Sequence, residues 1–410
     1  MKKSKAVIFF VAVVLLAGLN MVFMNANRPH ITEIPDMVNH EHMSAQKLVD
    51  NTWQIIRDNY YDSELNGQMW YRWKDHYRGK IKNPDDAKVA IDSMLASLDD
   101  PYSKFMSKEE YTDQNDSINS KISGIGVNIS SSSGKIRIVS VMDGTPAQAA
   151  NLLPDDVILS IDGKDVSGLQ VSQVATLVRG PENTLVELTI LRNKDKFSKK
   201  IMRKEIKLKT VKSLVDNNIG YIQITSFIGS TTPNEFLEAL EKTKDTQGLI
   251  LDLRGNTGGL LPNAVFIANL FIQNGNLVSI VGRNGLKYDI EARDTEFGVN
   301  KPTIVLVDGN SASASEILSG ALKDYHKAKL LGTRTYGKGM VQKIIPLPNE
   351  TGLNLTIAKY LTPSGHDINK KGIEPDVKVT FSLNDVKTKN DAQLNAAKNM
   401  LTEMCACTKK

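Results

Sequence analysis

Hydrophobic residues follow three different spacings along the chain, and each spacing predicts a different kind of structure. Over residues 44–106, as in SAQKLVDNTWQIIRDNYYD, apolar residues recur every three or four positions, which predicts helices. Over residues 112–207, short alternating runs separated by glycine-marked turns predict a β-rich segment. After Lys209, buried runs such as GLILDLRGN and PTIVLVDG alternate with amphipathic stretches, which predicts an α/β layer fold.

The first 27 residues have the composition of an export signal. MKKSK carries three lysines, and residues 6–24 follow without a charge, a length just sufficient for a membrane-spanning helix. No convincing cleavage site follows, so we favour an uncleaved membrane anchor over a cleaved signal peptide that would leave the protein secreted. The positive-inside rule then predicts that the chain beyond Arg28 lies on the extracytoplasmic face of the cell envelope.

Composition narrows the range of partners. Lys and Arg number 51 against 46 Asp and Glu, which gives a net charge of +5 over 410 residues. Because nucleic-acid binding usually needs a concentrated basic face, we expect no nucleic-acid partner. The two cysteines, Cys405 and Cys407, are badly spaced for an internal disulfide and too few for a zinc site, so we expect them on a dangling tail.

Three glycine-marked turns follow predicted buried strands, at the edge where open α/β sheets carry their sites. They are LDLRGNTGGLLP, DGNSASASEIL and YGKGMVQ. In the second turn, Ser313 precedes a predicted helix and could simply cap it together with Glu316. The same position also suits a nucleophile, because the unpaired N–H groups and positive dipole at a helix start can stabilise an oxyanion.

A catalytic serine needs a base, and Lys338 in the third turn is one candidate. Burial would have to lower the lysine pKa from about 10.4 towards 7 to 8 for it to accept a proton. The glycines on both sides of Lys338 let the backbone pack closely around it. Gln342, four residues later, could hold the lysine in place by a hydrogen bond.

Histidine is the alternative base. His366 could come near Ser313, with Asp367 or Asp376 as orienter, in a Ser-His-Asp hydrolase. His326 cannot serve, because about three turns of the same predicted helix separate it from Ser313.

Taken together, the three turns resemble those of the carboxyl-terminal processing peptidases, also called tail-specific proteases. YLTPSG at 360–365 and GIEPD at 372–376 match the same family. The resemblance implies an α/β protease core with a mixed sheet of the crotonase/ClpP-like kind. It also implies a nucleophile, a general base and a residue that orients the base, and these fall on Ser313, Lys338 and Gln342.

The family builds its oxyanion hole from backbone N–H groups of the GG turn and of the residue after the serine. The resemblance therefore points to Gly258 or Gly259 and to Ala314, without settling which glycine takes part. It implies acyl transfer that requires no metal and no other cofactor.

The β-rich segment resembles an inserted PDZ domain, most strongly at GTPAQAANLLPDDVI over residues 144–158. Asn151 and Asp155 stand where that family usually has glycines with positive φ, and these residue types tolerate positive φ next best. The resemblance implies that the apolar carboxyl end of a protein or peptide adds to the sheet as a strand. Its terminal carboxylate would meet the N–H groups of a loop made of Gly124, Ile125, Gly126 and Val127.

We therefore expect an exported serine endopeptidase that recognises apolar C-terminal tails through its PDZ domain and cleaves them with a Ser-Lys dyad. A homodimer through the amino-terminal helices is a further expectation from the family. The expected segments are a signal peptide or anchor (1–27), a linker (28–43), an amino-terminal helical region (44–111), the PDZ domain (112–207), the peptidase core (208–385) and a C-terminal helix and tail (386–410).

Two alternatives come from other functional classes. The chain could be a catalytically silent scaffold that only presents its PDZ groove. It could also be a P-loop NTPase, since residues 332–338 read G-x-x-x-x-G-K, but Gly339 stands where the Mg²⁺-binding Ser or Thr is required.

Overall fold

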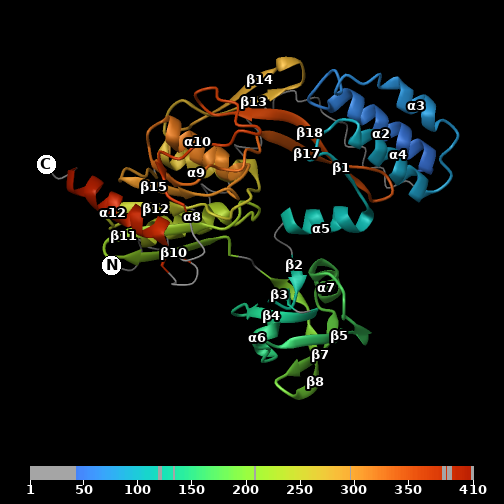
Figure 1. Cartoon of the computed structure of the whole chain (residues 1–410), viewed down its shortest axis with the longest axis horizontal. Helices are drawn as coiled ribbons and strands as arrows, with labels where there is room; N and C mark the ends of the chain where they lie inside the picture. Colours follow the sequence, from blue (N-terminus) through green and yellow to red (C-terminus); the bar gives the residue numbers. More distant parts are fainter. Residues whose placement is uncertain are drawn as a thin grey trace, which may run out of the picture. The chain divides into compact units, whose positions relative to one another are not determined.

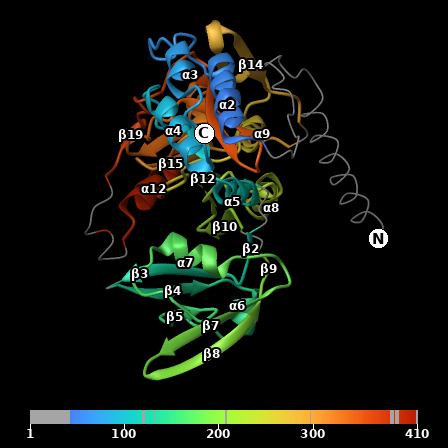
Figure 2. The same ribbon diagram turned by 90° about the vertical axis from the view of Figure 1, so that its right-hand side faces the viewer.

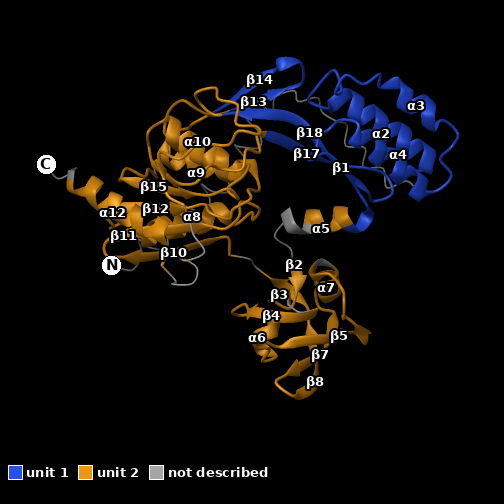
Figure 3. Cartoon of the chain, viewed as in Figure 1, with its two compact units in different colours: residues 1–109, 279–290, 340–361 blue, residues 110–278, 291–339, 362–410 orange. Residues whose placement is uncertain are grey.

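The computed structural model describes residues 43–118, 122–132, 134–206, 209–295, 297–380, 385 and 390–407. The expected export segment and almost all of the expected linker lie outside these residues. Within the described part of the chain, no helix has both the length and the apolar character that crossing a bilayer requires. The chain divides into two compact units, coloured separately in Figure 3. Unit 1 comprises residues 1–109, 279–290 and 340–361, and unit 2 comprises residues 110–278, 291–339 and 362–410.

Unit 1 packs helices against an antiparallel sheet. The helices are α2 (Ala45–Asn59), α3 (Tyr71–Tyr77) and α4 (Pro84–Ala96), in the region where apolar spacing predicts them. The sheet order is β1–β18–β13–β14, with β17 paired to β18. Its strands are β1 (Lys104–Met106), β13 (Asn276–Gly282), β14 (Lys287–Glu291), β17 (Met340–Pro346) and β18 (Gly352–Leu361).

One buried cluster joins the helices to the β17–β18 hairpin. Trp53 and Ile56 of α2 and Ile91 of α4 lie in it together with Leu353 and Leu355 of β18. The expectation that the helical region runs to residue 106 is wrong at its end, because residues 104–106 extend and pair with β18. The helix α5 (Lys108–Ile118) follows at the boundary between the units.

The β-rich segment of unit 2 forms a sheet in the order β3–β4–β5–β7–β8, with β6 paired to β5 and a separate β2–β9 pair. The helix α7 runs across β3 (Figure 2). Asn151 has φ 56° and Asp155 has φ 70°, which confirms that these residues take the glycine-like conformation. The elements are β2 (Ile122–Gly124), β3 (Val127–Ser132), β4 (Lys135–Val141), α6 (Pro146–Ala149), β5 (Val157–Ile161), β6 (Lys164–Asp165), α7 (Val171–Val178), β7 (Leu185–Arg192), β8 (Asp195–Met202) and β9 (Lys204–Ile206).

The rest of unit 2 is the predicted α/β layer fold (Figure 1). Its sheet has the order β10–β11–β12–β15–β16–β19, parallel except for the antiparallel pairing of β10 with β11, and is therefore mixed. The strands are β10 (Val211–Asp216), β11 (Ile219–Ile224), β12 (Gly248–Asp252), β15 (Thr303–Val307), β16 (Lys329–Gly332) and β19 (Val377–Lys378). The helices are α8 (Thr232–Lys242), α9 (Leu261–Phe271), α10 (Ala314–Asp324) and α12 (Ala392–Cys407).

The C-terminal helix covers one face of this sheet. Ile250, Ile304 and Leu306 of the strands share a buried cluster with Ala397 and Leu401 of α12. Side chains alternate along a strand, so the residues next to Ile250, Ile304 and Leu306 point to the opposite face of the sheet. There α8, α9 and α10 pack next to one another. The expectation of a dangling cysteine tail is wrong, because Cys405 is buried on α12 and its Sγ lies 3.4 Å from the Gln247 carbonyl oxygen.

Candidate active site

Ser313 lies in a tight turn between the buried strand β15 and the start of α10. Its backbone has φ 56° and ψ −114°, which is strained for any residue other than glycine. The two flanking serines hold the turn: Ser311 Oγ donates to the Leu253 carbonyl at 2.9 Å, and Ser315 Oγ donates to the Asn256 carbonyl at 2.8 Å. The outer serines therefore hold the turn against the segment that follows β12, and the middle serine carries the strain typical of a nucleophile between a strand and a helix.

The GG turn packs directly against Ser313. A Cβ added to Gly258 would lie 2.8 Å from Ser313 Cβ and 3.1 Å from Ala314 N, and Gly258 has φ 107°. Only glycine satisfies both the close approach and the positive φ. Asn256, fully buried, secures the contact, because its carbonyl accepts from Ala312 N at 3.0 Å and its Nδ2 donates to the Ile224 carbonyl at 2.8 Å.

The two candidate glycines differ in their hydrogen bonds. Gly258 N donates to Asn256 Oδ1 at 2.9 Å, so this N–H is already used inside the turn. Gly259 N has no hydrogen-bond partner among the residues that the structure describes. The Gly258 carbonyl accepts from Phe227 N at 2.9 Å, and in a trans peptide the Gly259 N–H points the opposite way. This geometry favours Gly259 over Gly258 as the oxyanion donor beside Ala314.

The buried carboxylate of Glu316 joins the serine turn to the lysine turn. Its Oε2 accepts from Ser313 N and from Lys338 N, each at 2.9 Å. The two nitrogens share one acceptor atom, so the distance between them is at most twice 2.9 Å. Its Oε1 accepts from Gly337 N at 2.8 Å and from Thr335 Oγ1 at 2.6 Å. Glu316 is fully buried, and four N–H or O–H donors compensate for the burial of its charge. The sequence identifies Glu316 only as a helix cap; its role as a link between the two turns escaped prediction.

The glycines beside Lys338 allow another segment to approach closely, as predicted. A Cβ on Gly337 would lie 2.8 Å from Gly372 N, and one on Gly339 would lie 2.8 Å from Asn369 N. Lys338 itself is half-buried. The residues after it form β17, a strand, whereas a P-loop lysine opens a helix, so the P-loop alternative is wrong.

Gln342 belongs to unit 1, at a β-bulge of the β17–β18 pair. Its Nε2 donates to Thr356 Oγ1 at 3.4 Å. The histidine alternative fits less well. His366 is exposed, and its Nδ1 lies 2.8 Å from Ser364 Oγ rather than against an orienting carboxylate, while Asp376 accepts from Leu330 N.

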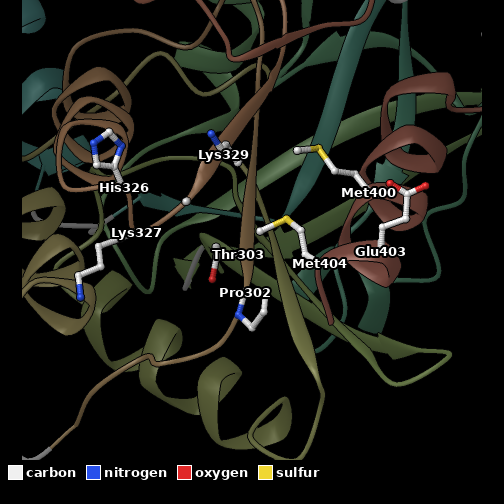
Figure 4. Close-up of a pocket in the computed structure, with 9 residues that line it drawn as sticks. Pro302, Thr303, His326, Lys327, Lys329, Met400, Glu403 and Met404 are labelled. Atoms are coloured by element: carbon white, nitrogen blue, oxygen red, sulfur yellow. The ribbon is translucent and has the colours of Figure 1, made fainter. Parts of the chain in front are cut away.

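His326 lies just after the end of α10 and lines a surface depression (Figure 4). This depression is lined by residues at the amino ends of β15 and β16, such as Thr303 and Lys329, and by Met400 and Met404 of α12. Ser313 follows the carboxyl end of β15, so the depression and the serine turn lie at opposite edges of the sheet.

Comparison with known proteins decides which family these turns belong to. Residues 218–379 match peptidase family S41, and residues 137–192 match the PDZ domain. The chain is 35% identical over 372 residues to the carboxyl-terminal-processing protease of Synechocystis, covering 87% of each chain. The chain belongs to peptidase family S41.

Other relatives agree. The carboxy-terminal processing protease CtpA of Bacillus subtilis is 41% identical over 311 residues, which cover 74% of this chain and 66% of that protein. A solved structure of the photosystem II D1 C-terminal processing protease matches with a TM-score of 0.58 and 29% identity, covering 83% of this chain and 94% of that one. The S41 chain is thus a serine-type peptidase of the carboxyl-terminal processing kind, with a PDZ domain, as the sequence motifs indicate.

This S41 chain also has a partly buried ion cluster directly before its GG turn, which the sequence did not reveal. Arg254 donates to the buried carboxylate of Asp252 and, through both terminal nitrogens, to Asp391 at 2.8 and 2.9 Å. Arg254 Nη1 also donates to Gln393 Oε1 at 3.0 Å, and both acceptors belong to the start of the α12 segment. Arg254 therefore ties the C-terminal helix to the segment that carries Gly258 and Gly259.

We expect Asp391→Asn to lower thermal stability and hydrolysis together. Partial burial acts to raise the pKa of Asp391, but hydrogen bonds and attraction from Arg254 outweigh it and lower that pKa below its ordinary value. Because the pKa of Asp391 is lower in the folded than in the unfolded state, its ionised carboxylate stabilises the fold at any pH above the unfolded-state pKa of about 3.9. This stabilisation is lost as the pH falls through the folded-state pKa. At pH 7 the variant should lose about 1–2 kcal/mol of stability, because the pair is bidentate but about one-third exposed.

Thermal denaturation at pH 7 and at pH 3 measures this dependence. The difference between the wild type and Asp391→Asn should shrink at pH 3. Asp216→Asn removes a different ion pair of the same helix, with Lys398, and should leave hydrolysis unchanged. Equal loss of hydrolysis in both variants would show that activity depends on the packing of α12 as a whole and not on the ion pair between Asp391 and Arg254.

Proposed function

We propose that this chain is an exported endopeptidase that takes apolar carboxyl-terminal tails through its PDZ domain and cleaves with a Ser313–Lys338 dyad. One observation carries the proposal: a single carboxylate oxygen of Glu316 accepts from both Ser313 N and Lys338 N. This shared oxygen fixes the backbones of nucleophile and base close together, which a Ser-Lys dyad requires.

In the proposed cycle, neutral Lys338 removes the proton of Ser313 Oγ as this oxygen attacks the scissile carbonyl. The N–H groups of Gly259 and Ala314 stabilise the oxyanion, helped by the positive end of α10. The lysine ammonium then gives its proton to the leaving amine, and water resolves the acyl-enzyme with Lys338 as base again. Gln342 orients Lys338 in this scheme.

The PDZ segment supports recognition of a free carboxyl end. The carbonyls of Ile125 and Gly126 accept from Ala147 N and Met142 N, so the trans N–H groups of Gly126 and Val127 point away from these bonds. Two successive outward N–H groups suit a carboxylate. β3 ends its sheet and is paired only with β4 among the described strands, which leaves an edge to which a peptide can add as a strand.

We expect amidation of a substrate's carboxyl end to weaken its recognition without slowing chemistry. Two peptides of identical sequence with an apolar last residue, one a free acid and one a carboxamide, should differ about tenfold in KM and little in kcat. In Gly126→Ala, whose Cβ would lie 2.4 Å from Thr145 Cβ, the two peptides should become equivalent. Equal KM values in the wild type would contradict carboxylate recognition.

The membrane anchor, the extracytoplasmic location and the homodimer are parts of the same proposal. They depend on the charge-free stretch at residues 6–24 after three lysines, and on the family expectation for the dimer. Fractionation of cells that express the full chain, with protease added to intact cells, tests the first two. Sedimentation of the purified protein tests the third.

A serine-directed fluorophosphonate tests the dyad directly. Intact-mass spectrometry should show one adduct, which peptide mapping places on Ser313. Lys338→Ala should slow labelling at pH 7 by about a hundredfold or more, because proton removal by a positioned base contributes this much. Unchanged labelling in Lys338→Ala, or an adduct on another serine, would refute the dyad.

A further inference from the structure

Tyr336, two residues before Lys338, has an exposed aromatic ring. It is 59% exposed, and its side chain makes no hydrogen bond and no ring contact with the residues that the structure describes. Exposure alternates along this turn, since Thr335 and Gly337 are buried while Lys338 is half-buried. Tyr336 and Lys338 therefore share the outer side of the turn.

The backbone of Tyr336 is fixed beside the nucleophile turn. Its N–H donates to the Ser311 carbonyl at 3.1 Å. Two residues further along each turn, Ser313 N and Lys338 N donate to the same Glu316 oxygen. These contacts hold the two segments side by side in the same direction. Tyr336 therefore lies beside the nucleophile turn without any rearrangement of its backbone.

The chemistry of the dyad determines which part of a bound peptide lies near this ring. When the acyl-enzyme forms, the bond from the scissile carbon to the leaving nitrogen breaks, and Lys338 gives its proton to that nitrogen. The nitrogen must therefore come within about 3 Å of the lysine Nζ. The carbonyl oxygen of the same bond is held by the other turns, at the N–H groups of Gly259 and Ala314. The residue after the scissile bond thus lies on the lysine side, where Tyr336 is.

We propose that Tyr336 is a specificity-determining residue that contacts the residue directly after the scissile bond and selects a large apolar or aromatic side chain there. The proposal rests on the Ser313–Lys338 dyad described above. A ring that is exposed in the free enzyme loses apolar contact with water when a second apolar side chain packs against it, and two rings gain further from edge-to-face or offset stacking. Glycine after the scissile bond has no side chain to make this contact.

Two tail peptides that differ only in the residue after the mapped cut test this selection, one with phenylalanine and one with glycine. With the full-length wild type, kcat/KM should be about tenfold higher for the phenylalanine peptide, as for one apolar contact made in a specificity pocket. Tyr336→Ala should reduce this ratio to about twofold or less. Tyr336→Phe keeps the ring and should keep the ratio close to that of the wild type.

Ile228→Ala is the matched control on the other side of the nucleophile. Ile228 is also an exposed apolar residue, at 38%, and a Cβ on Gly259 would lie 2.4 Å from Ile228 N. It therefore flanks the GG turn and not the lysine turn. Whatever this variant does to the rate, the ratio between the two peptides should stay as in the wild type.

Transfer of the acyl group to an added amine gives a second readout, which does not depend on how fast the acyl-enzyme forms. The amine nitrogen bonds to the acyl carbon, the bond from that carbon to Ser313 Oγ breaks, and the amine proton passes through Lys338 to Oγ. The amine takes the place of the leaving residue. Measured by mass spectrometry, phenylalaninamide should compete with water about tenfold better than glycinamide in the wild type, and about equally well in Tyr336→Ala.

Three results would overturn the proposal: equal kcat/KM for the two peptides in the wild type, an unchanged ratio in Tyr336→Ala, or the same loss of the ratio in Ile228→Ala. The last would show that the preference depends on the site as a whole. If Ser313→Ala retains hydrolysis, the dyad fails and this proposal with it. If Ser313→Ala is inactive but Tyr336→Ala keeps the preference for phenylalanine, only the role of Tyr336 fails.

Discussion

Ser313→Ala should reduce peptide hydrolysis by about 10⁴-fold or more, since removal of a nucleophile abolishes the covalent route and leaves only binding and the oxyanion hole. The fold should survive, because the turn around this residue is held by other groups. Ser311 and Ser315 donate to the carbonyls of Leu253 and Asn256, and Glu316 holds Ser313 through its backbone N–H. Alanine retains that N–H.

Rates of cleavage, measured by mass spectrometry on a peptide with a free apolar carboxyl end, check this result, with thermal denaturation as the control for folding. Ser315→Ala is the matched variant in the same motif. It removes one hydrogen bond to Asn256, so it should cost about 1 kcal/mol of stability and leave hydrolysis within about tenfold of the wild type. If Ser315→Ala were as inactive as Ser313→Ala at unchanged stability, the assignment of the middle serine would be wrong.

The sequence predicts the nucleophile turn well because its signals are local. A buried strand, a turn containing Gly309 and a helix start are all defined within about ten residues of Ser313, and the structure has each of them there. The same holds for the positive φ of Asn151 and Asp155. Where neighbours in sequence determine the backbone conformation, the hydrophobic pattern and the residue types are enough to predict it.

The contacts that organise the site are not local, and the sequence did not reveal them. Glu316 reaches Lys338 over 22 positions, and Arg254 reaches Asp391 over 137. No periodicity marks such pairs. A charged residue in an otherwise apolar helix face, as Glu316 is in α10, was the available signal, since charges are rarely buried without partners.

Strands outside the layered core were also harder to predict. β13 and β14 were missed, and β1 lies where a helix was expected. These strands form one sheet with β18, to which β1 and β13 pair over long sequence separations, while β14 pairs with β13. Pairing with β18 determines the conformation of β1, a three-residue segment too short to show alternation.

Glu316→Gln should cause about a hundredfold loss of kcat/KM although it touches neither reacting side chain, because small displacements of catalytic groups cost about this much. The carboxylate accepts two donors at each oxygen: Ser313 N and Lys338 N at Oε2, and Gly337 N and Thr335 Oγ1 at Oε1. In glutamine, one of these ends becomes an NH₂ group. Whichever end it takes, it faces at least one buried N–H group and cannot accept from it.

Of the two possible orientations of the side-chain amide in Glu316→Gln, one is less damaging than the other. The Thr335 hydroxyl, which also accepts from Ile373 N at 2.7 Å, can turn its oxygen towards an NH₂ group, so the amide nitrogen should settle on the Gly337 side. Gly337 N is then left without an acceptor, which costs about 1–3 kcal/mol and displaces the glycine directly before Lys338. Hydrolysis should therefore fall through kcat, with the KM of a tail peptide little changed.

Glu235→Gln provides a control of the same kind in the same unit. The Glu235 carboxylate also accepts four hydrogen bonds, from Thr210 N, Thr210 Oγ1, Val211 N and Thr231 Oγ1, but it belongs to α8 and ties down the start of β10. It should lose stability comparable to that of Glu316→Gln and retain hydrolysis. If both variants lost activity in proportion to their melting temperatures, Glu316 would matter only for folding. A hundredfold lower kcat in Glu316→Gln alone would mean that one carboxylate, by binding two backbone N–H groups at one oxygen, sets the distance between nucleophile and base.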